Sequence, residues 1–259
     1  MKRHVIWTVL LAACSGTTGG ERTSFAAVAF GPSAADGGML SFDSGAGYAV
    51  ALTRAHLHVG AIYLNQSVPS SGSQETSCVL PGIYVAQVTG PLDIDALSSE
   101  PQPFPEPGEG IGIKASAAEL WLNGGDINAT DDTTVILDAA GTASKEGVDY
   151  PFEASLTIGQ NRAIPSSDPA LPGANPICKQ RIVTPIAVDL TPVDGGTLQL
   201  QVDPRGWFNE VDFSTLPKSS DDPSLYRFAD APSDAADVNI YSGLRSRAGA
   251  YEISWKAGD

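Results

Sequence analysis

The stretch that decides the fold class is Phe152-Glu153-Ala154-Ser155-Leu156-Thr157-Ile158. Its even-numbered residues are apolar and its odd-numbered residues are polar. This period of two predicts a β-strand with one buried face. The same alternation recurs at residues 198–202 and 251–256. Further strands are expected at residues 25–30, 83–88, 114–122, 133–143 and 182–190.

Turn residues separate several of these strands. Lys145-Glu146-Gly147 lies between two strand patterns and predicts a hairpin, and Asp194-Gly195-Gly196 predicts a second one between residues 182–190 and 197–202. No amphipathic helix is expected, beyond a turn or two near Trp207 or residues 93–98. The sequence therefore predicts an all-β fold, an antiparallel β-sandwich or jelly roll with long proline-rich loops at residues 101–107 and 164–176.

The N-terminus has the features of a secretory signal peptide. Lys2 and Arg3 precede a short apolar run, which ends in small residues. This run is much shorter than the roughly 20 residues that a transmembrane helix needs. The last four residues of this region, Leu11-Ala12-Ala13-Cys14, resemble the lipobox of bacterial lipoproteins. An ordinary signal peptide with an incidental cysteine is the alternative.

The lipobox resemblance implies a membrane address. In that family the cysteine is acylated, palmitate included, and becomes the first mature residue, which here is Cys14. Residues 1–13 are then the signal peptide, residues 14–23 a flexible tether, and residues 24–259 a single β-sandwich domain. Ser15 after the cysteine favours the outer membrane over the inner one. Several acyl chains would make the tether permanent.

The composition is strongly acidic. The 259 residues include 15 Lys and Arg against 30 Asp and Glu, for a formal charge of −15. Loss of Lys2 and Arg3 with the leader leaves 13 basic residues and a charge of −17. Because phosphate binding needs clustered Lys and Arg, nucleic acid is excluded as a partner. The negative charge keeps a surface protein soluble, so it does not require a partner that binds the acidic side chains.

Two cysteines remain if Cys14 is acylated. An even pair in an exported chain predicts a disulfide between Cys78 and Cys178. Such a bridge would close a loop of about 100 residues and contribute up to ~4–5 kcal/mol in the chain-entropy model. Two free thiols and a pair of metal ligands are the alternatives.

The mature chain would retain only two histidines, His56 and His58. Positions two apart on a strand point to one face, close enough to share an ion, and imidazole suits copper and zinc. Arg54 lies on the same face and opposes a cation, so a solvated polar face is the alternative. This His-x-His in a strand-rich chain is similar to the periplasmic copper-binding proteins that accompany methanobactin systems. The similarity covers a strand or two and transfers no site residues.

The most distinctive local string is Asp203-Pro204-Arg205-Gly206-Trp207-Phe208. Trp207 and Phe208 beside Arg205 and carboxylates suit a sugar-stacking platform or a partner contact. The alternative is a corner in which both rings plug one end of the sandwich. A second string, at residues 126–132, clusters oxygen ligands of the kind that calcium uses, but Asp and Asn also hydrogen-bond their own backbone in loops.

The sequence contains no nucleophile elbow, HExxH, phosphate loop or dinucleotide fingerprint. We therefore expect no enzyme. The expected function is a lipid-anchored protein of the bacterial envelope or cell surface that binds an unknown protein or carbohydrate. The alternative is a periplasmic copper- or zinc-binding lipoprotein that uses His56 and His58.

Overall fold

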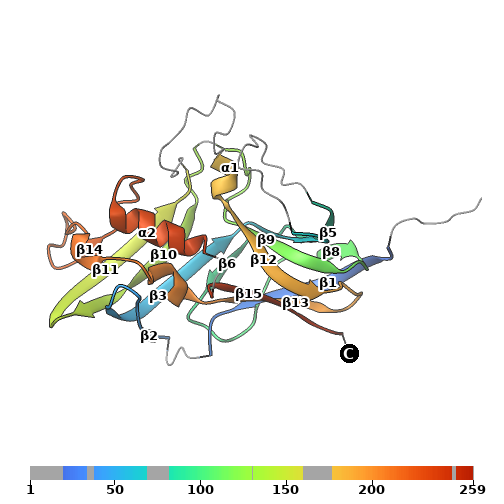
Figure 1. The fold of residues 1–259 in the computed structure, drawn as a ribbon, viewed down its shortest axis with the longest axis horizontal. Coiled ribbons are helices and arrows are strands. Elements are labelled where there is room, and N and C mark those ends of the chain that lie inside the picture. Colours follow the sequence, from blue (N-terminus) through green and yellow to red (C-terminus); the bar gives the residue numbers. More distant parts are fainter. Residues whose placement is uncertain are drawn as a thin grey trace, which may run out of the picture.

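The strands form two sheets that lie side by side along the long axis (Figure 1). The structure is a computed structural model that describes residues 20–33, 38–68, 82–129, 131–159, 177–246 and 249–258. The nine-stranded sheet has the order β12 (Ile182–Leu190), β9 (Ala115–Trp121), β4 (Ala61–Asn65), β5 (Tyr84–Val88), β8 (Gly108–Ile111), β1 (Arg22–Phe30), β13 (Thr197–Val202) and β15 (Tyr251–Lys256), with β7 (Gln102–Pro103) also on β1. The six-stranded sheet has the order β14 (Tyr226–Arg227), β11 (Val148–Thr157), β10 (Val135–Lys145), β3 (Ala49–Val59) and β2 (Leu40–Asp43), with β6 (Leu92–Asp95) also on β3.

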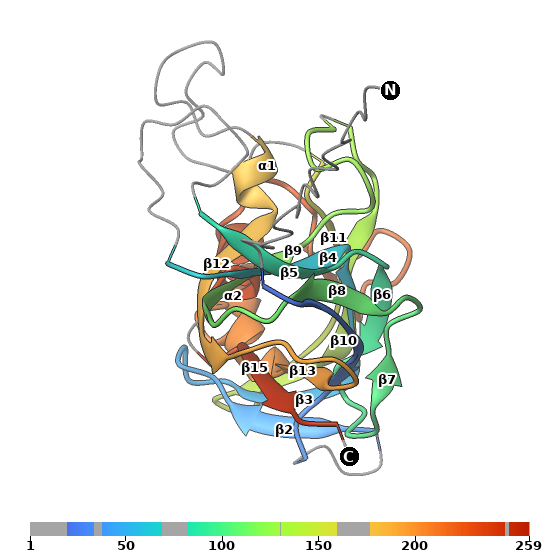
Figure 2. The ribbon, with the colours of Figure 1, turned by 90° about the vertical axis from the view of Figure 1, so that its right-hand side faces the viewer.

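The all-β prediction is confirmed, and the expected strands are present. Most pairs are antiparallel, but β1 runs parallel to β13 and β11 runs parallel to β14, so the sheets are mixed. The nine-stranded sheet curls until β12 and β15, at the two ends of its strand order, come into contact (Figure 2). The result is a sandwich that approaches a closed barrel.

The two sheets share one hydrophobic core. β3 ends at Val59 and β4 begins at Ala61, so the chain passes from one sheet to the other at Gly60. Along β3 the side chains of Ala55, Leu57 and Val59 are fully buried, and their neighbours on the other face are half-buried. The alternation of side chains along this strand therefore places its apolar residues in the core.

The hairpin predicted at Lys145-Glu146-Gly147 is confirmed. β10 and β11 pair from Lys145↔Val148 to Val135↔Thr157, with one register shift near Leu137. Glu146 and Gly147 both have positive φ, 54° and 79°. Two such residues give the turn a twist that matches the flanking strands, and glycine adopts this backbone without steric cost.

The hairpin predicted at Asp194-Gly195-Gly196 is wrong. β12 pairs with β9, whereas β13 pairs with β1 and β15. The turn residues bind β1 instead, because the Gly195 amide donates to the Ser24 carbonyl and Asp194 accepts the Ser24 amide. A turn signal therefore marked the bend correctly but did not determine the strand partners.

One helix was not expected from the sequence. α2 (Ala235–Leu244) has ten residues and buries Asp237, Ile240, Tyr241 and Leu244, which are spaced as one helical face. Because the buried face includes Asp237, a charged residue, the sequence does not show a continuous apolar helical face here. Shorter helical segments are α1 (Ile177–Gln180), η1 (Pro204–Phe208) and η2 (Phe213–Thr215), and η1 confirms the expected turn near Trp207. Residues 92–95 form β6 and not a helix.

Two boundaries differ from expectation. β1 begins at Arg22, inside the range 14–23 expected to be tether, because Arg22 and Thr23 pair with Ile111 and Gly110 of β8. The proline-rich stretch 101–107 is not a free loop, since Pro103 and Gln102 pair with β1 and the side chain of Phe104 is buried. The second proline-rich stretch, residues 164–176, lies outside the described residues.

Candidate functional site

Trp207 and Phe208 do not form the expected contact surface. Both side chains are fully buried. The ring of Phe208 packs in an aromatic cluster with Phe152 and Phe213, with centroids 5.5 and 6.2 Å away. Their burial and the ring packing of Phe208 fit the alternative interpretation, in which both rings fill the core at one corner. Of the three predicted contact residues, only Arg205 is exposed.

Arg205 lies at the edge of a groove between η1 and α2. This groove has a volume of about 740 Å³, within the range of small-molecule sites. We call it the η1–α2 groove. Its lining residues are Phe42, Asp43, Asp203, Arg205, Gly206, Asn209, Glu210, Asn239, Ser242, Gly243, Ser246 and Gly249.

Hydrogen bonds hold the polar groups of the η1–α2 groove in place. Asn209 accepts the Gly45 amide through its Oδ1 at 2.9 Å and donates from its Nδ2 to Glu210 at 2.6 Å. Asn239 donates from α2 to the Glu210 carbonyl at 2.8 Å. The carboxylate of Glu210 is therefore oriented by Asn209, and its backbone is held by Asn239, before any ligand arrives.

The charges of the η1–α2 groove favour a neutral or cationic ligand. Three carboxylates line it, those of Asp43, Asp203 and Glu210, against the one guanidinium of Arg205. That guanidinium is already bound to Asp203, with Nε 2.9 Å from Oδ1, and the hydrogen bond to Asp203 raises the pKa of Arg205. An anion entering the groove would meet an excess of negative charge.

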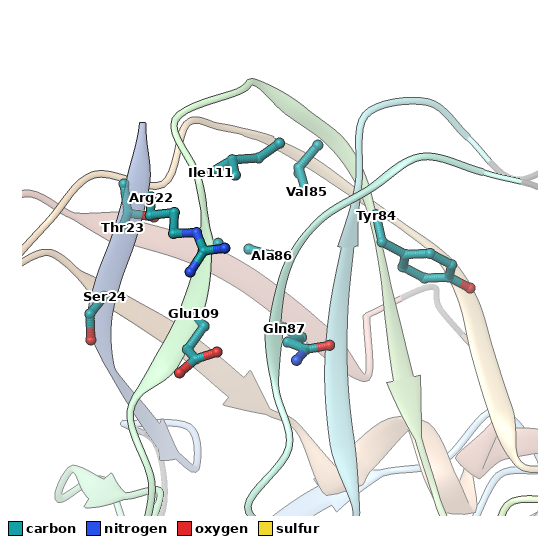
Figure 3. Close-up of a pocket in the computed structure, with 10 residues that line it drawn as sticks. Arg22, Thr23, Ser24, Tyr84, Val85, Ala86, Gln87, Glu109 and Ile111 are labelled. Carbon is teal, nitrogen blue, oxygen red and sulfur yellow. The ribbon is translucent and has the colours of Figure 1, made fainter. Parts of the chain in front are cut away.

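A second groove crosses β1, β8 and β5 in the nine-stranded sheet (Figure 3). It has a volume of about 570 Å³. We call it the β1–β8–β5 groove. Its lining residues are Arg22, Thr23, Ser24, Tyr84, Val85, Ala86, Gln87, Glu109, Gly110 and Ile111. The sequence carried no motif for this site, because its residues come from three segments far apart in the chain.

His56 and His58 lie on β3 and line one shallow pocket of about 470 Å³ together with Asp93, Val135, Asp138 and Ser155. The Nδ1 of His58 is 2.6 Å from the carboxylate of Asp93, while its Nε2 is buried without a hydrogen-bond partner. Arg54 forms an ion pair of 3.0 Å with Asp138. Arg54 thus occupies the carboxylate that could have served as a third ligand.

No metal centre is assembled in this pocket. Among the described residues, no three His, Cys, Asp or Glu side chains are placed to hold one metal ion. In the loop at residues 126–132, which could have been a calcium site, an acidic side chain bonds nearby backbone instead. Asp132 accepts the amides of Gly124 and Thr134. Arg181 also donates to the Ile127 carbonyl at 2.8 Å, which removes an oxygen ligand from that loop.

A buried acid on β9 escaped the sequence analysis. Glu119 is fully buried and accepts hydrogen bonds from Asn65 at 2.8 Å, Trp121 Nε1 at 3.1 Å and the Tyr84 hydroxyl at 3.3 Å. Burial raises the pKa of Glu119, and these donors oppose the shift in part. Glu119 falls in an apolar run, Ala117-Ala118-Glu119-Leu120, which is the one local signal of its burial.

The cysteines are only partly described. Cys178 is buried and disulfide-bonded. Its expected partner, Cys78, lies outside the described residues, as do the lipobox and Cys14, so the pairing and the acylation stay predictions. No helix of the described chain is long and apolar enough to span a bilayer.

Comparisons with known proteins give no further guide to the site. The sequence matches no protein-family model and no curated protein, and the fold matches no solved structure.

Proposed function

We propose that the mature chain is a lipid-anchored binding protein of the bacterial envelope, at the outer membrane. Its ligand is a neutral carbohydrate or related polyol that occupies the η1–α2 groove, and the protein binds this ligand without transforming it. The observation that carries the proposal is the polar lining of this groove, in which the amides of Asn209 and Asn239 and the carboxylate of Glu210 are held by hydrogen bonds.

Sugar hydroxyls both donate and accept hydrogen bonds, and the groove offers both kinds of partner. Asn209 and Asn239 carry amides that can do either, the carboxylates of Asp43 and Glu210 accept, and Ser242 has a rotating hydroxyl. Carboxylates are strong acceptors for neutral hydroxyls. Phe42, half-buried at the edge of the groove, supplies an apolar ring on which a sugar can stack. The sequence had suggested Trp207 for this role.

The membrane address in this proposal rests on the sequence. Leu11-Ala12-Ala13-Cys14 directly follows the apolar run of the leader, and Ser15 follows the cysteine. β1 begins only eight residues after Cys14, so an acyl anchor would hold that end of β1 within roughly 30 Å of the bilayer. The η1–α2 groove lies in the other half of the molecule, where a soluble glycan would reach it (Figure 1).

The proposal is tested by glycan-array screening of the purified protein, followed by calorimetric titration of the best glycan. We expect Glu210→Ala and Asn239→Ala each to weaken binding at least about tenfold, because each removes hydrogen bonds in the groove. Glu252→Ala, an exposed acid on β15, and Trp207→Phe should leave affinity unchanged. Chromatography of the glycan after incubation should show no product.

The absence of any glycan binding above background would overturn the proposal. Binding that is equally strong in Glu210→Ala and Asn239→Ala would do the same for the site. A product in the chromatogram would replace binding by catalysis.

The rival function is copper or zinc binding at His56 and His58. It is favoured by the one pocket that both imidazoles share and by the unpartnered Nε2 of His58. Titration with each metal should then show one ion per chain, and this uptake should disappear in His56→Ala and in His58→Ala. Equal metal content in the parent and both variants would dismiss the rival.

A further inference from the structure

The β1–β8–β5 groove is a site independent of the η1–α2 groove, in the other half of the molecule (Figure 1). Arg22 pairs with Ile111 and Ser24 pairs with Glu109 across β1 and β8. Gln87 of β5 pairs with Glu109 from the other side. Because paired and alternate residues share one face of a sheet, these side chains all project from the same surface.

The groove contains one charge of each sign, and neither is neutralised. Arg22 and Glu109 are both exposed. No ion pair or side-chain hydrogen bond joins Arg22 or Glu109 to any other described residue. Their register positions are diagonal neighbours, for which Cα atoms are roughly 7–8 Å apart. An unpaired guanidinium is notable in a chain with twice as many acidic as basic residues.

The upper rim of the groove is apolar. Figure 3 shows Ile111 and Val85 next to one another, with the guanidinium of Arg22 and the carboxylate of Glu109 below them. Val85 is buried, Ile111 is half-buried, and the ring of Tyr84 is 37 % exposed at the far side. A cation, an anion and an apolar surface are therefore presented together over a short distance.

We propose that the β1–β8–β5 groove binds a small zwitterion with an apolar substituent, of the amino-acid class. The ligand's carboxylate lies against the guanidinium of Arg22, which can receive it with two parallel hydrogen bonds. Its ammonium group lies against the carboxylate of Glu109, and its side chain lies against Val85 and Ile111. Such a ligand neutralises both unpaired charges without adding net charge to the site.

The same charge pattern occurs in the headgroup of phosphatidylethanolamine, in which an ammonium and an anion are also joined. That headgroup carries its anion as a phosphate diester and has no apolar substituent beside the charges. We therefore assign the free amino acid to the groove because Val85 and Ile111 lie next to Arg22 and Glu109. The experiment tests both a free amino acid and the phosphatidylethanolamine headgroup as ligands.

The test is calorimetric titration of the full-length protein in a non-ionic detergent. L-leucine is the probe, and L-leucinamide and N-acetyl-L-leucine are the analogues that lack the carboxylate or the ammonium charge. We expect L-leucine to bind and each analogue to bind at least about tenfold more weakly, because each leaves one charge of the groove unpaired. Glycerophosphoethanolamine should also bind more weakly than L-leucine.

Charge variants locate the contacts. Arg22→Gln should abolish the advantage of L-leucine over L-leucinamide, and Glu109→Gln should abolish its advantage over N-acetyl-L-leucine. Lys256→Gln and Glu100→Gln change exposed charges elsewhere and should leave affinity unchanged. Circular dichroism melts of all four variants check that the fold is retained.

Absence of L-leucine binding would overturn the proposal, as would affinity equal in the parent, Arg22→Gln and Glu109→Gln. Stronger binding of glycerophosphoethanolamine than of L-leucine would assign the groove to the lipid headgroup and overturn the amino-acid assignment. None of these outcomes bears on glycan binding, which depends on the η1–α2 groove.

Discussion

Single residues in this protein have roles that depend on burial more than on chemical type. Trp207 and Arg205 are two positions apart, yet Trp207 is fully buried in the core and Arg205 lies at the rim of a groove. Glu119 is a carboxylate in the position of an apolar residue, supported by three hydrogen-bond donors and no basic side chain among the described residues. Burying a charge without a countercharge costs free energy, which is why its pKa is raised.

Glu119 makes the stability of the protein depend on pH. Since its pKa is higher in the folded state, the folded protein binds the proton more tightly than the unfolded chain. The stabilisation is full below about pH 4.5 and is lost as the pH rises through the folded-state pKa. We expect the free energy of unfolding of the parent to fall, relative to Glu119→Gln, as the pH rises above about 4.5. Urea titrations at a series of pH values measure the difference.

Other carboxylates act in the opposite direction, so the comparison between parent and variant is what carries the prediction. For example, hydrogen bonds from Ser214 lower the pKa of Asp212. The contribution of Asp212 to the free energy of unfolding therefore grows as the pH rises. Glu252→Gln, at an exposed position, is the matched control and should show no such trend. A pH profile of Glu119→Gln parallel to that of the parent would show that Glu119 titrates normally.

At the scale of elements, α2 decides where the η1–α2 groove lies. Its buried face contains Asp237, which accepts the backbone amides of Ala229 and Ala231. The helix rests directly on η1, so closely that a Cβ added at Gly243 would lie 2.4 Å from the carbonyl oxygen of Trp207. This close approach of two backbones brings Asn239 and Ser242 to the groove that Arg205 and Glu210 line from the other side.

Gly243→Ala should therefore destabilise the protein by about 1–3 kcal/mol, as overpacking does in other cores. The sign is informative, because alanine in a helix interior is otherwise favoured over glycine by about 1 kcal/mol. Chemical denaturation measures the change. Ser242→Ala, the exposed neighbour, should stay within about 0.5 kcal/mol of the parent. A stabilised Gly243→Ala variant would mean that α2 does not rest on η1.

At the scale of the whole molecule, two separate grooves and one N-terminal anchor define the proposed protein. The described fold presents the η1–α2 groove and the β1–β8–β5 groove in different halves (Figure 1). The segment that resembles a lipobox precedes β1 in the sequence, so in the proposed protein the β1–β8–β5 groove would be the one nearer to the membrane. In the proposed mature chain the negative charge would disfavour electrostatic adsorption to anionic lipid, so the proposed acylation would have to hold the protein at the membrane.

Cys14→Ser should release the protein from the membrane. Without the thiol no acyl chain can be attached, and the described chain offers no helix that would replace it as an anchor. The variant is expressed in a bacterium and the cell extract is separated into a detergent phase and an aqueous phase. We expect the protein to move from the detergent phase to the aqueous phase, and its N-terminal peptide to lose the mass of the acyl chains. Ser15→Ala should retain the lipid. An unmodified Cys14 in the parent's mass spectrum would contradict the lipobox interpretation.

The strands, the first hairpin and the proposed membrane localisation follow from local sequence. Alternation in residues 152–158 requires no knowledge of distant segments, because one face of a strand is buried whatever sheet receives it. The turn at Glu146-Gly147 also joins adjacent segments. A lipobox is recognised as a short linear motif, so Cys14 could be proposed as a lipidation site without any fold.

Only the tertiary structure decided the strand partners and the grooves. β13 lies beside β1 and not beside β12, although a turn of two glycines precedes it, because pairing is settled by packing across segments some 170 residues apart. Trp207 was predicted to be a contact residue and is a core residue, because burial depends on which distant elements pack against it, here α2. Arg22 and Glu109 line one groove only because β1 and β8 pair in one register, and no local pattern specifies that register.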